Sequence, residues 1–89
     1  MRAVITVVGK DMVGILAKVS ALCSECNVNV IEVSQSILQD MFCMIMLVDA
    51  GKINIPFTEF SDALTSEGKK MNLVIHVMHE DVFNSMHHI

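Results

Sequence analysis

The alternation of hydrophobic and polar positions over the first fifty residues predicts a strand, a helix and a two-stranded hairpin. Arg2 to Val8 is apolar on both alternating faces, which is typical of a central strand covered on both sides. Residues 12–26 repeat apolar side chains at helical spacing and predict an amphipathic helix. Val28 to Leu38 and Met41 to Asp49 are predicted as two further strands, with a tight hairpin at Gln39-Asp40. Polar side chains in the middle of Val28 to Leu38 predict a partly exposed strand.

The remaining residues predict a second helix, a fourth strand and a short terminal helix. Pro56 suits the first turn of a helix, and Gly68 is expected to cap its C-terminal end. The apolar face of that helix consists of Phe57, Phe60, Ala63 and Leu64. Met71 to Met78 alternates between two faces as a strand does. Residues 80–89 begin with two acids and place apolar side chains on one helical face, which favours a short C-terminal helix.

These elements follow the order βαββαβ. Two right-handed crossover units joined by a hairpin form an antiparallel four-stranded sheet with both main helices on one face. The predicted fold class is α+β, a ferredoxin-like βαββαβ sandwich with a short C-terminal helix. Residues 1–89 are expected to form one domain, with a core over 1–79 and a helical tail over 80–89. Because the first and third strands are apolar on both sides, we expect a second subunit, the terminal helix, or both to cover the second face of the sheet or its edge.

Composition adds expectations about partners and location. Hydrophobic residues make up 53% of the chain, more than the interior of one 89-residue domain readily accommodates, so a homodimer is expected. The net charge is −4 and the six Lys and Arg residues are scattered, which argues against nucleic acid as a partner. Met1 leads into the first strand without the features of a signal segment, and the apolar run Met41 to Val48 is too short for a membrane span. A cytoplasmic location without membrane contact is therefore expected.

Several functions of this architecture require residues that this chain lacks, either in the loop after the first strand or on the central strands. Copper transport needs two cysteines in that loop, whereas Cys23 and Cys26 fall in the following helix. Acyl-phosphate chemistry needs an arginine there, and Arg2 is the only arginine of the chain. RNA binding needs aromatic side chains on the central strands, and Phe42 is the only aromatic residue in a predicted strand. A P-loop is excluded because the glycine that ends the loop is followed by apolar residues.

The cysteines, histidines and methionines raise further possibilities. Residues 23–26 have the CxxC spacing of a redox pair, but they lie toward the C-terminal end of the helix, so packing in the core is the preferred interpretation. Four histidines stand near two acids and offer ligands for zinc or nickel: His76, His79, His87 and His88. A solvated tail is preferred because no paired Cys/His spacing is present, and no metal, cofactor or catalytic residue is expected. Five methionines are expected in adaptable core or interface surface: Met12, Met41, Met44, Met46 and Met78.

The chain resembles an ACT domain. An apolar first strand leads into Gly9-Lys10-Asp11-Met12-Val13-Gly14-Ile15-Leu16, which opens the helix, and Asn27-Val28-Asn29-Val30 begins the second strand. The resemblance covers the whole chain, and residues 79–89 are similar to the ending of small bacterial and archaeal proteins with one ACT domain and a short tail. It implies a regulatory domain that binds amino acids or similar molecules between the first loop of one subunit and the second strand of another. The ligand-binding residues that it implies are Gly9, Lys10, Asp11, Met12, Val13, Gly14, Asn29 and Val30.

The loop chemistry suits an amino acid. Free N–H groups and the positive dipole end at the start of the helix favour a carboxylate, and Gly14 lets a ligand approach the backbone. Asp11 is a candidate partner for the ligand's ammonium group, and Asn29 of the neighbouring subunit offers hydrogen bonds. A structural interpretation stays open: Asp11 caps the helix, Gly14 permits close helix–sheet packing, and Asn29 forms a local hydrogen bond.

The sequence supports two classes of function, and an enzyme is a third, disfavoured class. The leading hypothesis is a non-catalytic regulator that senses an amino acid or other small molecule at a homodimer interface. The alternative is a ligand-free structural or adaptor dimer that docks on a partner protein through its sheet face or terminal helix. An enzyme is disfavoured because no Ser, Cys or Lys stands beside a recognisable base at informative spacing.

Overall fold

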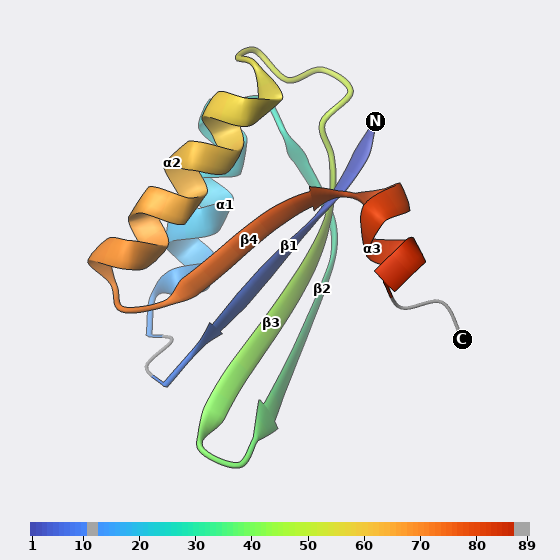
Figure 1. Cartoon of the computed structure of the whole chain (residues 1–89). Helices are drawn as coiled ribbons and strands as arrows, with labels where there is room; N and C mark the ends of the chain where they lie inside the picture. The colour runs from blue at the N-terminus through green and yellow to red at the C-terminus, as the bar shows by residue number, and fades with distance from the viewer. Residues whose placement is uncertain (11–12, 87–89) are drawn as a thin grey trace.

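The computed structural model describes residues 1–10 and 13–86, and the helices and strands named below lie within these ranges. A four-stranded antiparallel sheet carries α1 and α2 on one face, while α3 lies at the other (Figure 1). In chain order the elements are β1 (Arg2–Gly9), α1 (Ile15–Glu25), β2 (Asn29–Leu38), β3 (Met41–Asp49), α2 (Phe57–Lys70), β4 (Val74–His79) and α3 (Glu80–Met86). The strand order is β2-β3-β1-β4, so β1 is central. The predicted ferredoxin-like βαββαβ sandwich is confirmed.

The core lies between the sheet and the two main helices. Ile5 of β1 pairs with Met46 of β3 on one side and with Val77 of β4 on the other, so these side chains share one face. Phe60 and Leu64 of α2 are fully buried against that face. Burial of large apolar side chains is the main stabilising contribution in a domain of this size. The two main helices therefore cover the face that carries Ile5, Met46 and Val77.

The opposite face of the sheet is covered only in part, by α3. Val4 points to this face and is nevertheless 3% exposed, whereas Ile45 and Val74 are 41% and 55% exposed. An ion pair of 2.9 Å between Arg2 Nη2 and Glu80 Oε2 ties the start of α3 to β1. None of the residues of α3 is buried. The expectation that the terminal helix covers part of the second face is therefore met, and Figure 1 shows the helix near the start of β1 and directly after the end of β4.

The start of α1 corrects the predicted helix over 12–26. Helix α1 begins at Ile15 and ends at Glu25. Gly14 has φ 77° and ψ 0°, in the left-handed region that a right-handed helix excludes. The helix can begin only after that residue, a backbone feature that side-chain periodicity does not report.

The end of α2 corrects the predicted role of Gly68 as a C-terminal cap. Helix α2 continues to Lys70, and a Cβ at Gly68 would lie 2.8 Å from Ile75 Cγ1. Gly68 therefore serves close packing against β4. The left-handed turn residue is Asn72, at φ 58°, and the turn delays β4 to Val74 rather than Met71.

Two burial predictions also need correction. Ala63, predicted on the apolar face of the second helix, is exposed. Strand β2, predicted to be partly exposed, is exposed at every residue except the half-buried Val30, because it is the edge strand of the sheet. The hairpin at Gln39-Asp40 between β2 and β3 is confirmed. Among the described residues, no helix is both long enough and apolar enough to cross a membrane.

Candidate functional site

The predicted loop joins the end of β1 to the start of α1. Gly9 ends β1 and is buried, because the side chain of Leu73 occupies the space that a Cβ would take. Lys10 and Val13 are exposed, and Val13 is 87% exposed. Asp11 and Met12, both predicted as ligand-binding residues, lie outside the described residues.

Gly14 is the N-cap of α1 and has no side-chain cap. Its carbonyl accepts the hydrogen bond from Lys18 N at 3.1 Å, so the N–H groups of Ile15, Leu16 and Ala17 have no helical partner by position. A Cβ at Gly14 would meet no atom of the described residues within 4 Å, apart from its chain neighbours. The positive φ therefore explains the glycine at this position, and close helix–sheet packing does not. Within the described residues, the space beside Gly14 leaves the helix start accessible to an anion.

A cavity of about 410 Å³ opens beside this helix start. It is lined by Lys10, Val13, Gly14, Ile15, Leu16, Ala17, Gln35 and Phe42. Gln35 lies on β2 and was not predicted from the sequence. Its Nε2 lies 3.9 Å from Sδ of Met44, and this sulfur is a weak hydrogen-bond acceptor. The amide oxygen of Gln35 stays available for a ligand. Gln35 is polar on the helix side of an apolar sheet, a signal visible only once the strand register is known.

A second cavity, of about 360 Å³, lies at the other end of α1. Its lining residues are Ser20, Ser24, Asn27, Val28, Asn29 and Val30. Asn29 and Val30 were predicted, whereas the two serines were not. Ser20 and Ser24 are four residues apart and therefore project from the same side of α1. The Asn29 side chain is exposed and forms no hydrogen bond with another residue of the described ranges, so the local hydrogen bond considered above is not found.

Hydrogen bonds between two loops hold the start of β2 in place. Asn27 Nδ2 donates to the Lys52 carbonyl at 2.8 Å, and Asn54 Nδ2 donates to the Glu25 carbonyl at 2.9 Å. They connect the turn after α1 to the segment before α2. A side-chain amide that satisfies a backbone carbonyl stabilises such a turn by about 1 kcal/mol. The turn that leads into Asn29 is thereby tied to the segment before α2.

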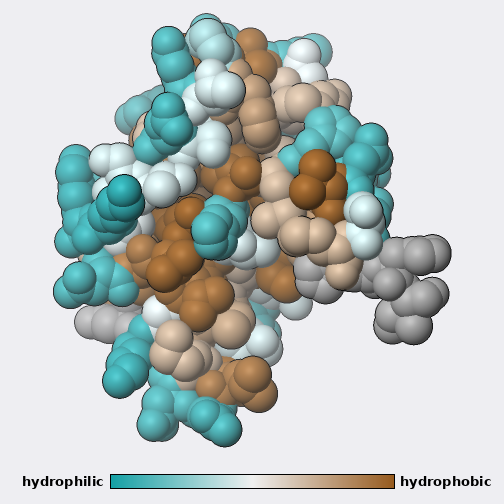
Figure 2. Space-filling model, in the orientation of Figure 1, coloured by the Kyte–Doolittle hydropathy of each residue, from teal (hydrophilic) through white to brown (hydrophobic). Residues whose placement is uncertain are grey.

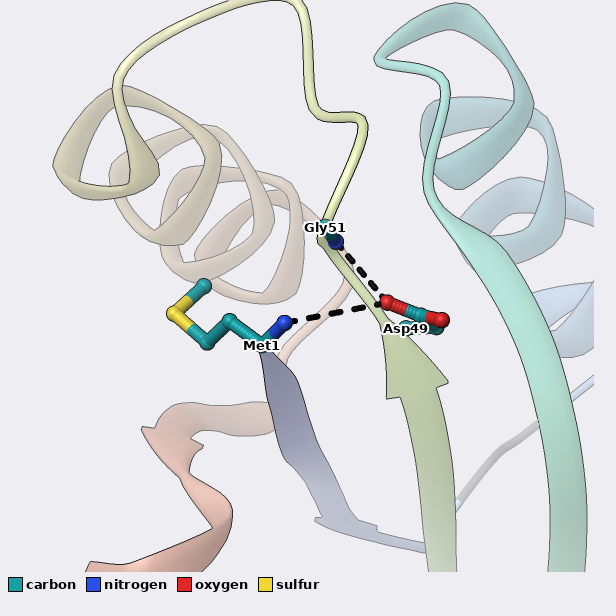
Figure 3. A network of polar contacts seen from close by, with 3 residues as sticks. All are labelled: Met1, Asp49 and Gly51. Atoms are coloured by element: carbon teal, nitrogen blue, oxygen red, sulfur yellow. Dashed lines mark hydrogen bonds and ion pairs between the residues drawn. The ribbon is translucent and has the colours of Figure 1, made fainter.

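Asp49, which pairs with Asn29 in the β2–β3 register, anchors the same end of the sheet. Its Oδ1 accepts a hydrogen bond from Gly51 N at 2.8 Å and lies 3.9 Å from the Met1 ammonium nitrogen (Figure 3). The carboxylate thus ties together the first residue of the chain and the turn after β3. This contact is partly exposed, and such ion pairs contribute at most about 1 kcal/mol. We infer that the Asp49 carboxylate positions the start of β1 and the turn after β3.

Within one chain the two halves of the predicted site lie at opposite ends of the sheet. Gly9 pairs with Phe42, at the hairpin end of β3, whereas Asn29 pairs with Asp49 at the other end. From Asn29 to Gln35 the extended strand β2 covers about 20 Å. The structure therefore brings Lys10, Val13 and Gly14 together, brings Asn29 and Val30 together, and keeps these two groups apart.

The thiols of α1 pack as core side chains. Cys23 and Cys26 are free and buried, in agreement with the preferred interpretation of the CxxC spacing. Burial, followed by the charge of Cys26, raises the pKa of the Cys23 thiol to about 11. Burial and Glu25 raise the pKa of Cys26 as well. Both thiols are protonated at neutral pH, which suppresses their nucleophilic chemistry.

The predicted metal and methionine roles can be compared with the structure only in part. The described ranges hold no group of three or more His, Cys, Asp or Glu side chains arranged to bind a metal ion. His87 and His88 lie outside those ranges. Met44 and Met46 are buried in the core, Met41 and Met78 are partly exposed, and Met12 lies outside the described residues.

Comparison with known proteins assigns the family. The family model described as the ACT domain matches residues 2–78. A UPF0237 protein of Methanosarcina acetivorans is 44% identical over 88 residues, which cover 99% of this chain and 96% of the relative. A UPF0237 protein of Clostridium perfringens is 46% identical and is covered completely, as is this chain. An ACT domain protein from Streptococcus pneumoniae has a similar structure, with a TM-score of 0.80, 34% identity and 93% coverage of each chain. The chain belongs to the ACT domain family.

Proposed function

We propose that this protein is a non-catalytic regulator that senses an amino acid at two equivalent sites of a homodimer. ACT domains are typically regulatory and bind small ligands, and the family model spans residues 2–78. The observation that carries the proposal is the division of the candidate site into two cavities at opposite ends of α1 and β2. A second copy of the chain is needed to bring the cavity at Gly14, the loop half of the site, next to the cavity at Asn29, the strand half.

The edge of β2 supports pairing with a second copy. One side of this strand pairs with β3, and the other is the free edge of the sheet. Ile31, Ile37 and Leu38 leave 47%, 71% and 70% of their surfaces exposed along it. A long exposed edge strand with apolar side chains at its ends is a template for pairing with another chain. Antiparallel pairing of two β2 strands about a two-fold axis perpendicular to the sheet keeps all helices on one face.

This symmetry brings complementary half-sites together. Because the two α1 helices then run antiparallel across the axis, the start of one helix lies beside the end of the other. The cavity at Gly14 and Gln35 consequently faces Asn29 and Ser24 of the partner subunit. Each dimer contains two such sites, and each site takes residues from both chains.

The composite site has the chemistry of an amino-acid receptor. The free N–H groups at the start of α1 and the Lys10 ammonium favour the ligand carboxylate. Oxygens of Asn29 and Ser24 of the partner subunit accept hydrogen bonds from its ammonium group. Val13 and Leu16 line the loop half with apolar surface that suits a small uncharged side chain.

Ligand binding at this position regulates subunit geometry. A ligand that contacts both subunits adds its binding free energy only to the arrangement in which the two halves meet. The amino-acid concentration therefore shifts the population of that arrangement, and a protein partner that recognises it is controlled in turn.

Screening of the twenty amino acids by thermal shift and calorimetry tests the proposal. A specific ligand at one hundred times its Kd adds about 2.7 kcal/mol to stability and raises the melting temperature. Asn29→Ala and Asp11→Ala each abolish the shift if these residues bind the ligand. A protein that responds to none of the twenty contradicts amino-acid sensing and favours the adaptor dimer.

Mixing two binding-defective variants tests whether the site spans two subunits. In a mixed dimer of Asp11→Ala and Asn29→Ala chains, one site carries both substitutions and the other carries neither. After subunit exchange, random pairing restores about a quarter of the native binding capacity, because half of the dimers are mixed. Each variant alone binds nothing and serves as the control. If the mixture also fails to bind, the loop and Asn29 do not form a shared site.

A further inference from the structure

A groove of about 320 Å³ lies between α3 and the sheet face opposite the main helices, away from the cavity at Gly14. Thr6, Val8, Cys43 and Ile45 contribute to its sheet side. Figure 2 shows hydrophobic surface over the strands in the middle of the view and on α3 at the right. The groove has the size and the mainly apolar lining of a small-ligand site.

The roof of the groove comes from α3. Phe83 and Met86 reach over the sheet from this helix, and Met78 completes the wall on β4. Met86 is 61% exposed, and α3 has no buried residue. The helix is fixed at its start by the Arg2–Glu80 ion pair and by the hydrogen bond from Asp81 N to His79 Nδ1 at 3.1 Å. Within the described residues, the space beneath α3 is left unfilled by a helix that is tied to β1 and β4 at its start.

Two polar side chains, Thr6 of β1 and His76 of β4, line the groove. Thr6 and His76 are direct partners in the β1–β4 register, which brings their Cβ atoms to about 5 Å on the same face. Both side chains offer a hydrogen-bond donor. The lining residues within the described ranges include no aspartate or glutamate. A carboxylate head finds two donors here, whereas a cationic head finds no carboxylate partner.

We propose that this groove binds a medium-chain carboxylic acid, with its head at Thr6 and His76 and its chain beneath Phe83 and Met86. His76 is exposed, so the head stays at the rim while the chain enters the apolar part. The groove is open to solvent, and its volume of about 320 Å³ lies within the range of small-ligand sites. Sodium octanoate, which carries a carboxylate head on an unbranched apolar chain, is the probe. This site is separate from the proposed amino-acid site and does not depend on it.

Titration of the ¹⁵N-labelled protein with octanoate tests the proposal. We expect saturable shifts at the backbone amides of Thr6, Cys43, Ile45 and His76. Acetate, which lacks the chain, and octylammonium, which reverses the charge of the head, should bind far more weakly. His76→Gln should weaken octanoate binding on the order of fivefold, the loss of one exposed charge-assisted hydrogen bond.

Matched variants test whether octanoate binds in the groove or elsewhere on the molecule. Phe83→Ala removes the roof and should weaken binding several-fold, whereas Val82→Ala, at the exposed neighbouring position of α3, should not. Thr6→Val should weaken binding, whereas Ser34→Ala, on the same sheet face outside the groove, should not. Equal binding of octylammonium, shifts confined to Lys10 and Gly14, or no saturation at millimolar octanoate overturns the proposal. So does a dimer in which a second copy buries Ile45, since the groove is then occupied by protein.

Discussion

At the scale of single residues, Gly14 and Gly68 are glycines for opposite reasons. Gly14 has no described residue within 4 Å of an added Cβ, apart from its chain neighbours, but it has a φ of 77°, which an L side chain adopts only with strain. Gly68 has ordinary helical geometry within α2 but no room, because Ile75 Cγ1 and the Leu73 carbonyl oxygen lie 2.8 Å and 3.0 Å from an added Cβ. One glycine supports the helix start at the candidate site, and the other lets α2 approach β4.

Gly68→Ala should destabilise the protein by about 1–3 kcal/mol, because overpacking against β4 exceeds the gain of about 1 kcal/mol in helix propensity. Urea unfolding at neutral pH measures the difference. Ser66→Ala, at an exposed position of the same helix turn, is the control and should change stability by less than about 0.5 kcal/mol. A Gly68→Ala protein as stable as the native one would show that Ile75 moves aside at little cost.

At the scale of elements, the strands were easier to predict than the helix ends. The alternation around Ile5 and Val7 identified a central strand, because burial on both faces leaves a continuous apolar run. The start of α1 depends on the backbone conformation of Gly14, and the end of α2 depends on the left-handed turn at Asn72. Neither conformation is encoded in the spacing of apolar side chains, so both boundaries were misplaced.

The short helix α3 should unfold locally far more often than the sheet. It buries none of its residues, whereas Ile5 and Val7 of β1 are completely buried, and local opening is least costly where few apolar contacts are lost. Native-state hydrogen exchange should show α3 amides at least about tenfold less protected than those of β1. Octanoate should slow exchange in α3 and leave α1 unchanged if the groove is its site. Protection of α3 equal to that of β1 in the free protein would contradict this.

At the scale of the whole molecule, two regions of exposed apolar surface matter for the proposals: the β2 edge and the groove beneath α3. Ile37 and Leu38 represent the first region, and Ile45 and Met86 the second. A hydrophobic content of 53% in a chain of 89 residues exceeds what one small core buries. The proposed dimer covers the first region and leaves the second for a ligand.

The β2 edge should determine the oligomeric state. We expect sedimentation equilibrium to give the mass of a dimer, and Ile37→Lys to raise the dimer dissociation constant at least about tenfold by placing a charge in the interface. Val82→Lys, a comparable change on α3, should leave the dimer intact. A native protein that sediments as a monomer at every concentration would contradict both the dimer and the shared amino-acid site.

The sequence predicted the order of the strands and helices, the central position of β1 and the burial of Cys23, because each depends on periodicity or on residue type. It also directed attention to the loop at Lys10 and to Asn29 through the resemblance to the ACT domain. It did not reveal Gln35, Ser24 or the partnership of Thr6 with His76, because strand register and helix packing bring these residues to their sites. Only the tertiary structure separates Asn29 from the loop within one chain, since antiparallel pairing sends the start of β2 to the far end of the sheet.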